Sequence, residues 1–298
     1  MERKQPESIR AQRRPKGYVS TIATNMLHMK NPWVTAFWSA IFPGLGSIIM
    51  GGYIKGFILI IWATLIILKS HLYLALLYSL TGRIPLAIEI LDTLWLLLYA
   101  PVYMFSIWQA YRDAIELNKY SILADREDSA ILPMRISTME INFFDKRNPW
   151  VAAAWSLLMP GIGHLYTHRI PTSFFLLTWW VGVSYLSHLL PAIHYTLLGH
   201  FQEATAIIVP EFLLFLTPIY TFAVYDCYVN TVEYNRLFEV EQSRFLIDNY
   251  QHPGFEMPFK STSLNHEEQP AQPNIVAKIS NYIAKILENS KFLDKDNV

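Results

Sequence analysis

The chain of 298 residues contains little charge and almost no cysteine. Only 16% of its residues are charged, with 24 basic and 24 acidic side chains, so the formal net charge is zero. Soluble domains have about 25% charged residues, and a neutral chain has no bulk attraction to nucleic acid. Cys227 is the single cysteine, which excludes a disulfide scaffold and a multi-cysteine metal site. By contrast, 52% of the residues are hydrophobic and 14% are aromatic.

The apolar residues are concentrated in six long runs. These are residues 33–50, 57–68, 94–108, 151–166, 174–190 and 212–228. The runs are apolar all round rather than along one stripe, and Trp and Tyr crowd their ends, as they do at membrane interfaces. Because a membrane helix needs about 20 mostly apolar residues, we expect an all-α integral membrane protein embedded in a lipid bilayer. The alternative is a soluble bundle of buried helices.

The chain overlays itself when it is shifted by about 117 residues, which predicts two tandem homologous units. The Asn-Pro-Trp-Val sequence at 31–34 recurs at 148–151, and a Pro-Gly-x-Gly motif occurs once in each copy. The residues of that motif are Pro43, Gly44 and Gly46 in the first copy and Pro160, Gly161 and Gly163 in the second. Proline removes a backbone donor and the glycines favour a bend. Each unit is therefore predicted to contain a broken helical segment and two spanning helices with a helical hairpin between them.

Lys and Arg residues near the apolar runs predict the topology. They cluster in the amino-terminal segment, between the two units and after the second unit, and they are scarce in the two inserts. Since such residues mark the cytoplasmic side, we expect a multi-pass protein of the bacterial cell membrane with both termini in the cytoplasm and both inserts outside. Four full spans with two re-entrant segments satisfy this, and six spans in inverted units are the alternative. The predicted divisions are a basic tail (1–18), membrane unit 1 (19–118), a connector (119–135), membrane unit 2 (136–235), a tail with a flexible linker (236–273) and an amphipathic helix (274–294).

Two resemblances follow from these motifs. The Pro-Gly-Leu-Gly sequence at 43–46, followed by Lys-Gly at 55–56, resembles the turn of small bacterial two-helix hairpin membrane proteins, which implies a membrane hairpin and no catalytic activity. Each insert resembles a single tetratricopeptide helix pair, which implies two closely packed short helices. The residues that carry the second resemblance are His71, Tyr78, Gly82 and Ala87 in the first insert and His188, Tyr195, Gly199 and Ala204 in the second.

Ionisable residues give few signs of chemistry. His71 and His188 replace the packing aromatic of the tetratricopeptide pattern, so we expect them to pack, with a ligand or proton-relay role as the alternative. His164 and His168 have the spacing of two metal ligands on one helix face, but no carboxylate accompanies them, so no metal or cofactor is predicted. Asp113 and Asp226 follow the last apolar runs and are predicted to cap cytoplasmic helix ends.

Two further expectations concern segments outside the apolar runs. An apolar stripe at helical spacing in 275–287 predicts a helix that lies on anionic lipid or docks on a partner. The β-branched segments 19–22 and 136–139 are predicted to pair with each other as antiparallel strands.

The chain carries no phosphate loop, nucleophile elbow or metalloprotease motif. We therefore expect no enzyme but a scaffold or assembly protein of a membrane complex, with membrane or cytoplasmic proteins as partners. A transporter or channel component built from duplicated units is the alternative, and a membrane-embedded enzyme acting on lipid or peptide is the second alternative.

Overall fold

The computed structural model describes residues 15–252, and these are mostly helical. The described residues up to Ile247 belong to one compact unit, and Asp248–Val298 form a second unit of which only residues 248–252 are described. The predicted helix at 274–294 lies outside the described residues. Two helical stretches, Tyr53–Ser70 and Pro210–Tyr250, are long and apolar enough to cross a membrane, or up to four if each bent helix pair forms one span.

The elements fall into two series. The N-terminal half, residues 15–126, contains β1 (Gly17–Val19), β2 (Thr24–Met26), α1 (Pro32–Ile41), α2 (Leu45–Ile49), α3 (Tyr53–Ser70), α4 (Leu72–Leu80), α5 (Ile84–Ile90) and α6 (Thr93–Arg126). After β3 (Ile131–Leu132), the C-terminal half, residues 134–247, contains β4 (Met134–Ile136), β5 (Ile141–Phe143), α7 (Pro149–Leu158), α8 (Ile162–Tyr166), α9 (Ile170–Leu186), α10 (Leu189–Leu197), α11 (Phe201–Ile207), α12 (Pro210–Leu213) and α13, which begins at Leu216 and ends at Tyr250. From β4 to α12, every element begins 117 residues after its counterpart between β1 and α6.

The Pro-Gly-x-Gly motif separates α1 from α2 and α7 from α8. Gly44 has a φ of 99° and Gly161 a φ of 106°, in the left-handed region that side chains with a Cβ rarely adopt. Gly44 also lies against the carbonyl oxygen of Gly56, and Gly161 against that of Ser173. The first apolar segment of each half is thus two short helices, as the sequence predicted, rather than one straight span.

One apolar core joins the two halves. It contains Trp38, Phe42 and Ile60 from the N-terminal half and Leu176 and Phe222 from the C-terminal half, all buried. Aromatic pairs cross between the halves: Trp38 meets Phe222 edge-on with ring centroids 5.5 Å apart, Phe42 lies 5.1 Å from Trp179, and Phe57 stacks on Phe175 at 4.3 Å. Such pairs fix the relative position of the helices that carry them.

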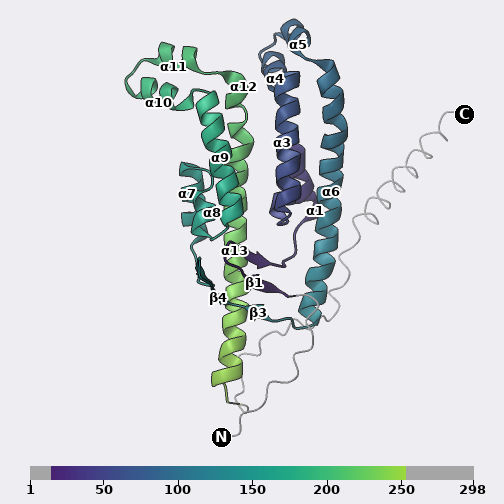
Figure 1. Ribbon diagram of the computed structural model, residues 1–298, viewed down its shortest axis with the longest axis vertical. Helices are drawn as coiled ribbons and strands as arrows, with labels where there is room; N and C mark the ends of the chain where they lie inside the picture. Colours follow the sequence, from purple (N-terminus) through teal and green to yellow (C-terminus); the bar gives the residue numbers. More distant parts are fainter. Residues whose placement is uncertain (1–14, 253–298) are drawn as a thin grey trace, which may run out of the picture. The chain divides into compact units, whose positions relative to one another are not determined.

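The short strands lie at one end of the long helices, and the hairpins α4–α5 and α10–α11 lie at the other (Figure 1). β1 pairs antiparallel with β2, with Gly17 opposite Met26, and parallel with β3, while β4 pairs antiparallel with β5. The predicted pairing of segments 19–22 and 136–139 with each other is therefore wrong.

A serine turn explains that difference. Ser20 Oγ donates to the Ala23 carbonyl at 2.6 Å and accepts from the Ala23 amide at 3.1 Å. Ser137 makes the same two contacts with Glu140, at 3.0 and 3.4 Å. Each turn returns the chain onto the segment just before it, so β1 pairs with β2 and β4 with β5, and the second edge of β1 is taken by β3.

The inserts are helical hairpins, as predicted. Gly82 and Gly199 have φ values of 76° and 83° at the turns. Ala87 and Ala204 are buried where the two helices of each hairpin cross, and Tyr78 and Tyr195 are half-buried.

The expected packing of the two repeated histidines is corrected by the structure. His71 and His188 are exposed, with φ values of 52° and 54°. They occupy the left-handed breaks between α3 and α4 and between α9 and α10, and Nδ1 of His71 lies 3.2 Å from Oε1 of Glu211 on α12.

Candidate functional site

A buried ionic cluster lies between helices of the C-terminal half. Asp226, on α13, is 1% exposed, and its Oδ2 accepts hydrogen bonds from Nη1 of Arg169 and lies 3.0 Å from Nε2 of His164. Its Oδ1 accepts from Nδ2 of Asn230 at 2.7 Å. Both carboxylate oxygens are therefore paired, as a buried charge requires. Arg169 sits at the start of α9 and His164 on α8, so the cluster ties three helices together.

Residues 168–170, between α8 and α9 and at the start of α9, also contact the β1–β2 turn of the N-terminal half. Nε2 of His168 lies 3.0 Å from the carbonyl oxygen of Thr21, and the amide of Ile170 donates to the carbonyl of Ile22 at 3.0 Å. Asn142 Nδ2, from β5, donates to the Ser20 carbonyl at 2.9 Å. Side chains and backbone of the C-terminal half therefore fix the turn that precedes the first apolar segment.

A cavity of about 290 Å³ opens beside Arg169, and we call it the basic pocket. Its lining includes the basic side chains of Lys16, Lys30 and Arg169, together with His28 and Tyr53. Lys30 Nζ donates to Nε2 of His28 at 2.9 Å. The pocket thus gathers three cations, which come from both halves of the chain.

Burial and nearby positive charges lower the pKa values of His28 and Lys30. Burial, strengthened by the positive charges of Lys30 and Arg169, lowers the pKa of His28 to about 3, so this imidazole is neutral near pH 7. Burial also lowers the pKa of the Lys30 amine to about 8, although Asp226 opposes the shift. At pH 7 Lys30 therefore carries a charge that its surroundings disfavour.

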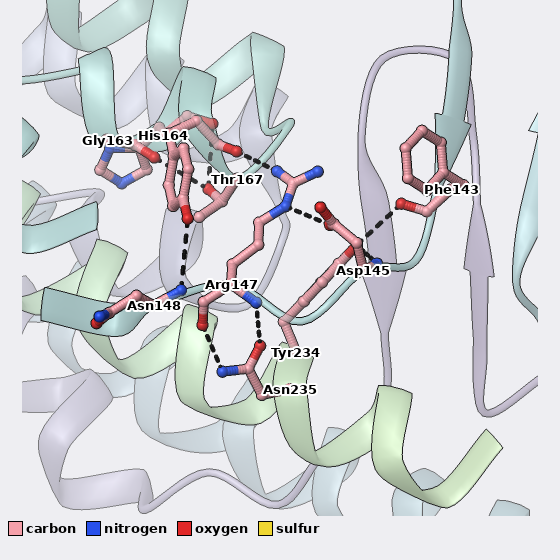
Figure 2. Close-up of polar contacts among 10 residues, drawn as sticks. Phe143, Asp145, Arg147, Asn148, Gly163, His164, Thr167, Tyr234 and Asn235 are labelled. Atoms are coloured by element: carbon pink, nitrogen blue, oxygen red, sulfur yellow. Dashed lines mark hydrogen bonds and ion pairs between the residues drawn. The ribbon is translucent and has the colours of Figure 1, made fainter. Parts of the chain in front are cut away.

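Arg147 occupies the position of Lys30 in the C-terminal half (Figure 2). Arg147 Nε donates to Asp145 Oδ1 at 2.6 Å, and the guanidinium lies over the rings of Tyr166 and Tyr234, 5.6 and 5.5 Å from their centroids. Its Nη1 donates to the carbonyl oxygen of Tyr166. Positive charge is here neutralised by a carboxylate and covered by aromatic rings.

The backbones of Lys30 and Arg147 are held in the same way, each by an asparagine side chain. Asn118 Oδ1 accepts from the Lys30 amide at 2.8 Å, and its Nδ2 donates to the Lys30 carbonyl at 2.7 Å. Asn235 makes the same pair of bonds with Arg147, at 2.9 and 2.6 Å. The two halves therefore hold a basic side chain in the same place, and the neighbouring residues determine whether it is neutralised.

The structure brings few of the sequence-predicted residues into this site. Gly163 lies beside His164 in Figure 2, and it packs against Ser156 and Cys227, while Gly46 packs against Ser39 and Ala110. The remaining predicted residues are in the helix breaks and hairpins described above. His164 and His168 share no ligand, because one faces Asp226 and the other a backbone carbonyl. Within residues 15–252, no group of three or more His, Cys, Asp or Glu side chains could hold a metal ion.

Sequence reasoning missed the ionic cluster, because it assigned Asp226 to a helix cap at the end of a span. The overlay of the chain on itself contained a signal. Asp226 aligns with the neutral Gln109, and Arg169 aligns with Gly52, so both charges occur only in the C-terminal half. Opposite charges that appear together in one half and not in the other indicate a contact between them. Comparison of the chain with protein-family models, curated proteins and solved structures finds no match, so the site is interpreted from its own geometry.

Proposed function

We propose that the chain is a multi-pass membrane protein built from two tandem homologous units and that it acts as a scaffold in a membrane complex. The tandem arrangement is supported by the constant spacing of 117 residues between matching elements. It is also supported by matching contacts, such as the asparagine bonds of Asn118 and Asn235 and the serine turns of Ser20 and Ser137.

Membrane insertion is supported by the outer surface of the long helices. Large apolar side chains are exposed along α3 at Ile54, Ile58 and Ile61 and along α6 at Leu94 and Leu97. Such a surface is unfavourable in water over this length and is suited to lipid. The basic residues of the amino-terminal segment and of the connector support a cytoplasmic position for the strand-bearing end.

The observation that carries the scaffold proposal is the apolar core between the halves. Transporters built from repeats place their substrate site near the middle of the membrane at the interface of the repeats. Here the side chains of Trp38, Phe42, Phe222 and Trp179 fill that interface with interlocking rings. The ionic cluster at Asp226 fastens three helices at one end of this core. An interface packed in this way favours two halves that stay fixed relative to each other, as a scaffold requires, over halves that move against each other during transport.

The hairpins are the surfaces that we propose for partner binding. Leu80 ends α4 and is 77% exposed, and Leu197 ends α10 and is 81% exposed. The two leucines are 117 residues apart, so each hairpin presents the same apolar side chain. A partner that buries both would gain about 2 kcal/mol per side chain.

A cysteine-labelling experiment tests the topology. Met139→Cys and Gln202→Cys are placed in a Cys227→Ala background, because Ala110 already occupies the position equivalent to Cys227. An impermeant thiol reagent applied to intact cells is expected to label residue 202 and to leave residue 139 unlabelled until the cells are opened. Labelling of residue 139 in intact cells would contradict the proposed arrangement.

Photo-crosslinking tests the scaffold. A photoreactive residue at position 80 or 197 is expected to form a defined adduct with a membrane partner, and the double variant Leu80→Glu/Leu197→Glu is expected to lose that partner in a mild-detergent pull-down. Gln202→Glu, on the exposed surface of α11, adds a negative charge without removing apolar surface and serves as the control. If the native protein, the double variant and Gln202→Glu all retain the same partner in the pull-down, the hairpins do not bind it.

A further inference from the structure

We propose that the basic pocket binds a phosphate group. This inference stands on the charges and cavity of the strand-bearing end and is independent of what the hairpins bind.

The pocket contains more positive charge than its lining neutralises. None of the described residues that line it is an Asp or Glu. Lys16 is paired with Asp125 at 2.5 Å, and Arg169 is paired with Asp226, but Lys30 has no carboxylate partner among the described residues. Two bonds from Asn118 fix the Lys30 backbone, and Nε2 of His28 accepts from its ammonium at 2.9 Å, which places the ammonium beside the cavity. An ammonium in a cavity with no carboxylate in contact favours an anion.

His28 supplies a second unused donor. An ammonium group can only donate, so Nε2 of His28 accepts from Lys30, and the neutral ring then carries its hydrogen on Nδ1. Nδ1 is buried and has no hydrogen-bond partner among the described residues. Leaving a buried donor unpaired is unfavourable. A bound oxyanion would accept from the imidazole and from Lys30 together.

The size and the donor set favour phosphate over a carboxylate. A cavity of about 290 Å³ holds a group larger than a carboxylate. A guanidinium has five N–H donors; Asp226 contacts the Nη1 nitrogen of Arg169 and the Tyr53 side chain also bonds to this group, which leaves further donors. Phosphate presents several acceptor oxygens and is the anion that Arg and Lys together bind well.

The equivalent basic residue of the C-terminal half, Arg147, is paired within the chain instead. Asp145 occupies the position equivalent to His28, and Tyr166 occupies the position equivalent to Ile49. Together they neutralise and cover Arg147. The N-terminal half has an imidazole and an aliphatic side chain at these positions, and both line the basic pocket.

The phosphate has two sources that share this chemistry. The pocket lies near the starts of α3 and α9, which are candidate spans, at the depth where lipid headgroups would lie, so a lipid phosphate or a free phosphate could enter. Binding is measured on the purified full-length protein in neutral detergent. The probes are inorganic phosphate in one arm, and mixed micelles with phosphatidic acid or with diacylglycerol in the other.

We expect saturable binding that becomes at least tenfold weaker in Lys30→Gln and remains within threefold of the native value in Lys30→Arg. Lys146→Gln is the control, because it removes one exposed charge, paired with Glu239, outside the pocket. Binding of phosphatidic acid but not diacylglycerol, with no competition by inorganic phosphate, identifies a lipid ligand, and binding of inorganic phosphate alone identifies a free one. Absence of binding to both phosphate probes, or equal binding by Lys30→Gln, overturns the proposal.

A measurement on the native chain covers the case in which Lys30→Gln does not fold. Acetylation of the Lys30 amine, followed by mass spectrometry of its peptide, is expected to slow at least fivefold when phosphate or phosphatidic acid saturates the pocket. Acetylation of Lys146 in the same sample is expected to be unchanged. Equal protection of both lysines, or protection of neither, rejects the site.

Discussion

The two halves place similar polar groups on matching helices but pair them differently. In the N-terminal half, Gln109 Nε2 donates to Asp113, and Lys55 Nζ reaches the same carboxylate at 2.8 Å. In the C-terminal half the carboxylate and the amide exchange places, as Asp226 and Asn230, and the cation comes from Arg169 instead. The N-terminal cluster is solvated, with the Lys55 side chain 44% exposed, whereas Asp226 is 1% exposed.

The basic residues just before α1 and α7 differ in the opposite direction: here the C-terminal residue is neutralised and the N-terminal one is not. Arg147 is neutralised by Asp145 and covered by Tyr166, whereas Lys30 faces a neutral histidine and a cavity. The C-terminal half therefore uses its charges to seal the structure, and the N-terminal half leaves one charge available. The difference indicates that matching backbones need not share a role, because a few residue differences decide whether a basic side chain is paired with a carboxylate within the chain.

The largest effect is expected from Asp226→Asn. This change removes the carboxylate that pairs with the buried Arg169 guanidinium, and breaking a buried pair in this way costs about 3–5 kcal/mol. Thermal unfolding in detergent, followed by tryptophan fluorescence, measures the loss. The matched control is Asp113→Asn, which breaks the exposed pair with Lys55 and is expected to cost about 0–1 kcal/mol. Equal losses in the two variants would contradict the distinction between a sealed and a solvated cluster.

A smaller and equal effect in both halves is expected from Gly46→Ala and Gly163→Ala. A Cβ at Gly46 would press on Ser39 Oγ and the Thr35 carbonyl, and one at Gly163 on Ser156 Oγ and the Ala152 carbonyl. Because backbone atoms cannot move aside easily, overpacking of this kind costs about 1–3 kcal/mol.

Gly182→Ala on α9 is the control for the glycine variants. No atom lies within 4 Å of its added Cβ, so alanine is expected to stabilise this helix by up to about 1 kcal/mol. Destabilisation of only one of the two motif variants, in the same unfolding assay, would show that the helix contacts differ between the halves.

The features that could be predicted from the sequence are those fixed by local chemistry. Pro43 and Gly44 determine the break between α1 and α2, and Gly82 determines the hairpin turn, because each acts through its own backbone conformation. The turn at Ser20 is equally local, but the β-branched residues of segments 19–22 and 136–139 indicate only extended backbone and not which strand each one pairs with.

The ionic cluster could not be predicted in the same way, because it depends on the faces that three separate helices present to one another. Asp226 lies ten residues into α13, and a linear reading places it at the end of an apolar run. Its partner Arg169 is 57 residues away and looks like an ordinary flanking charge. The exposed histidines at 71 and 188 were misassigned for a related reason, since spacing alone does not reveal a left-handed break.

The smallest change in folding stability is expected from Lys30→Met. The pH dependence of this change tests the contrast between Lys30 and the neutralised Arg147. The pKa of Lys30 is about 8 in the folded protein, below the ordinary 10.5. Between these pH values the unfolded chain binds more protons, so stability rises with pH, and below about pH 8 the full cost of the buried charge is present. The charged or titratable groups that face Lys30 are His28, Arg169, Asp226 and Glu233, with Lys16 near His28. His28 stays neutral throughout this range because its pKa is about 3.

Replacing Lys30 with Met removes this cost while retaining a long apolar side chain. The variant is expected to be more stable than the native protein at pH 7, by about 1 kcal/mol once the solvent contact of the half-buried amine is allowed for. The advantage is expected to shrink between about pH 8 and 10.5 and then to vanish, in unfolding curves recorded without phosphate. Arg147→Met, which breaks a neutralised pair, is expected to be less stable than the native protein at pH 7. A stabilisation by Lys30→Met that is independent of pH would trace the effect to side-chain packing rather than to the charge of the Lys30 amine.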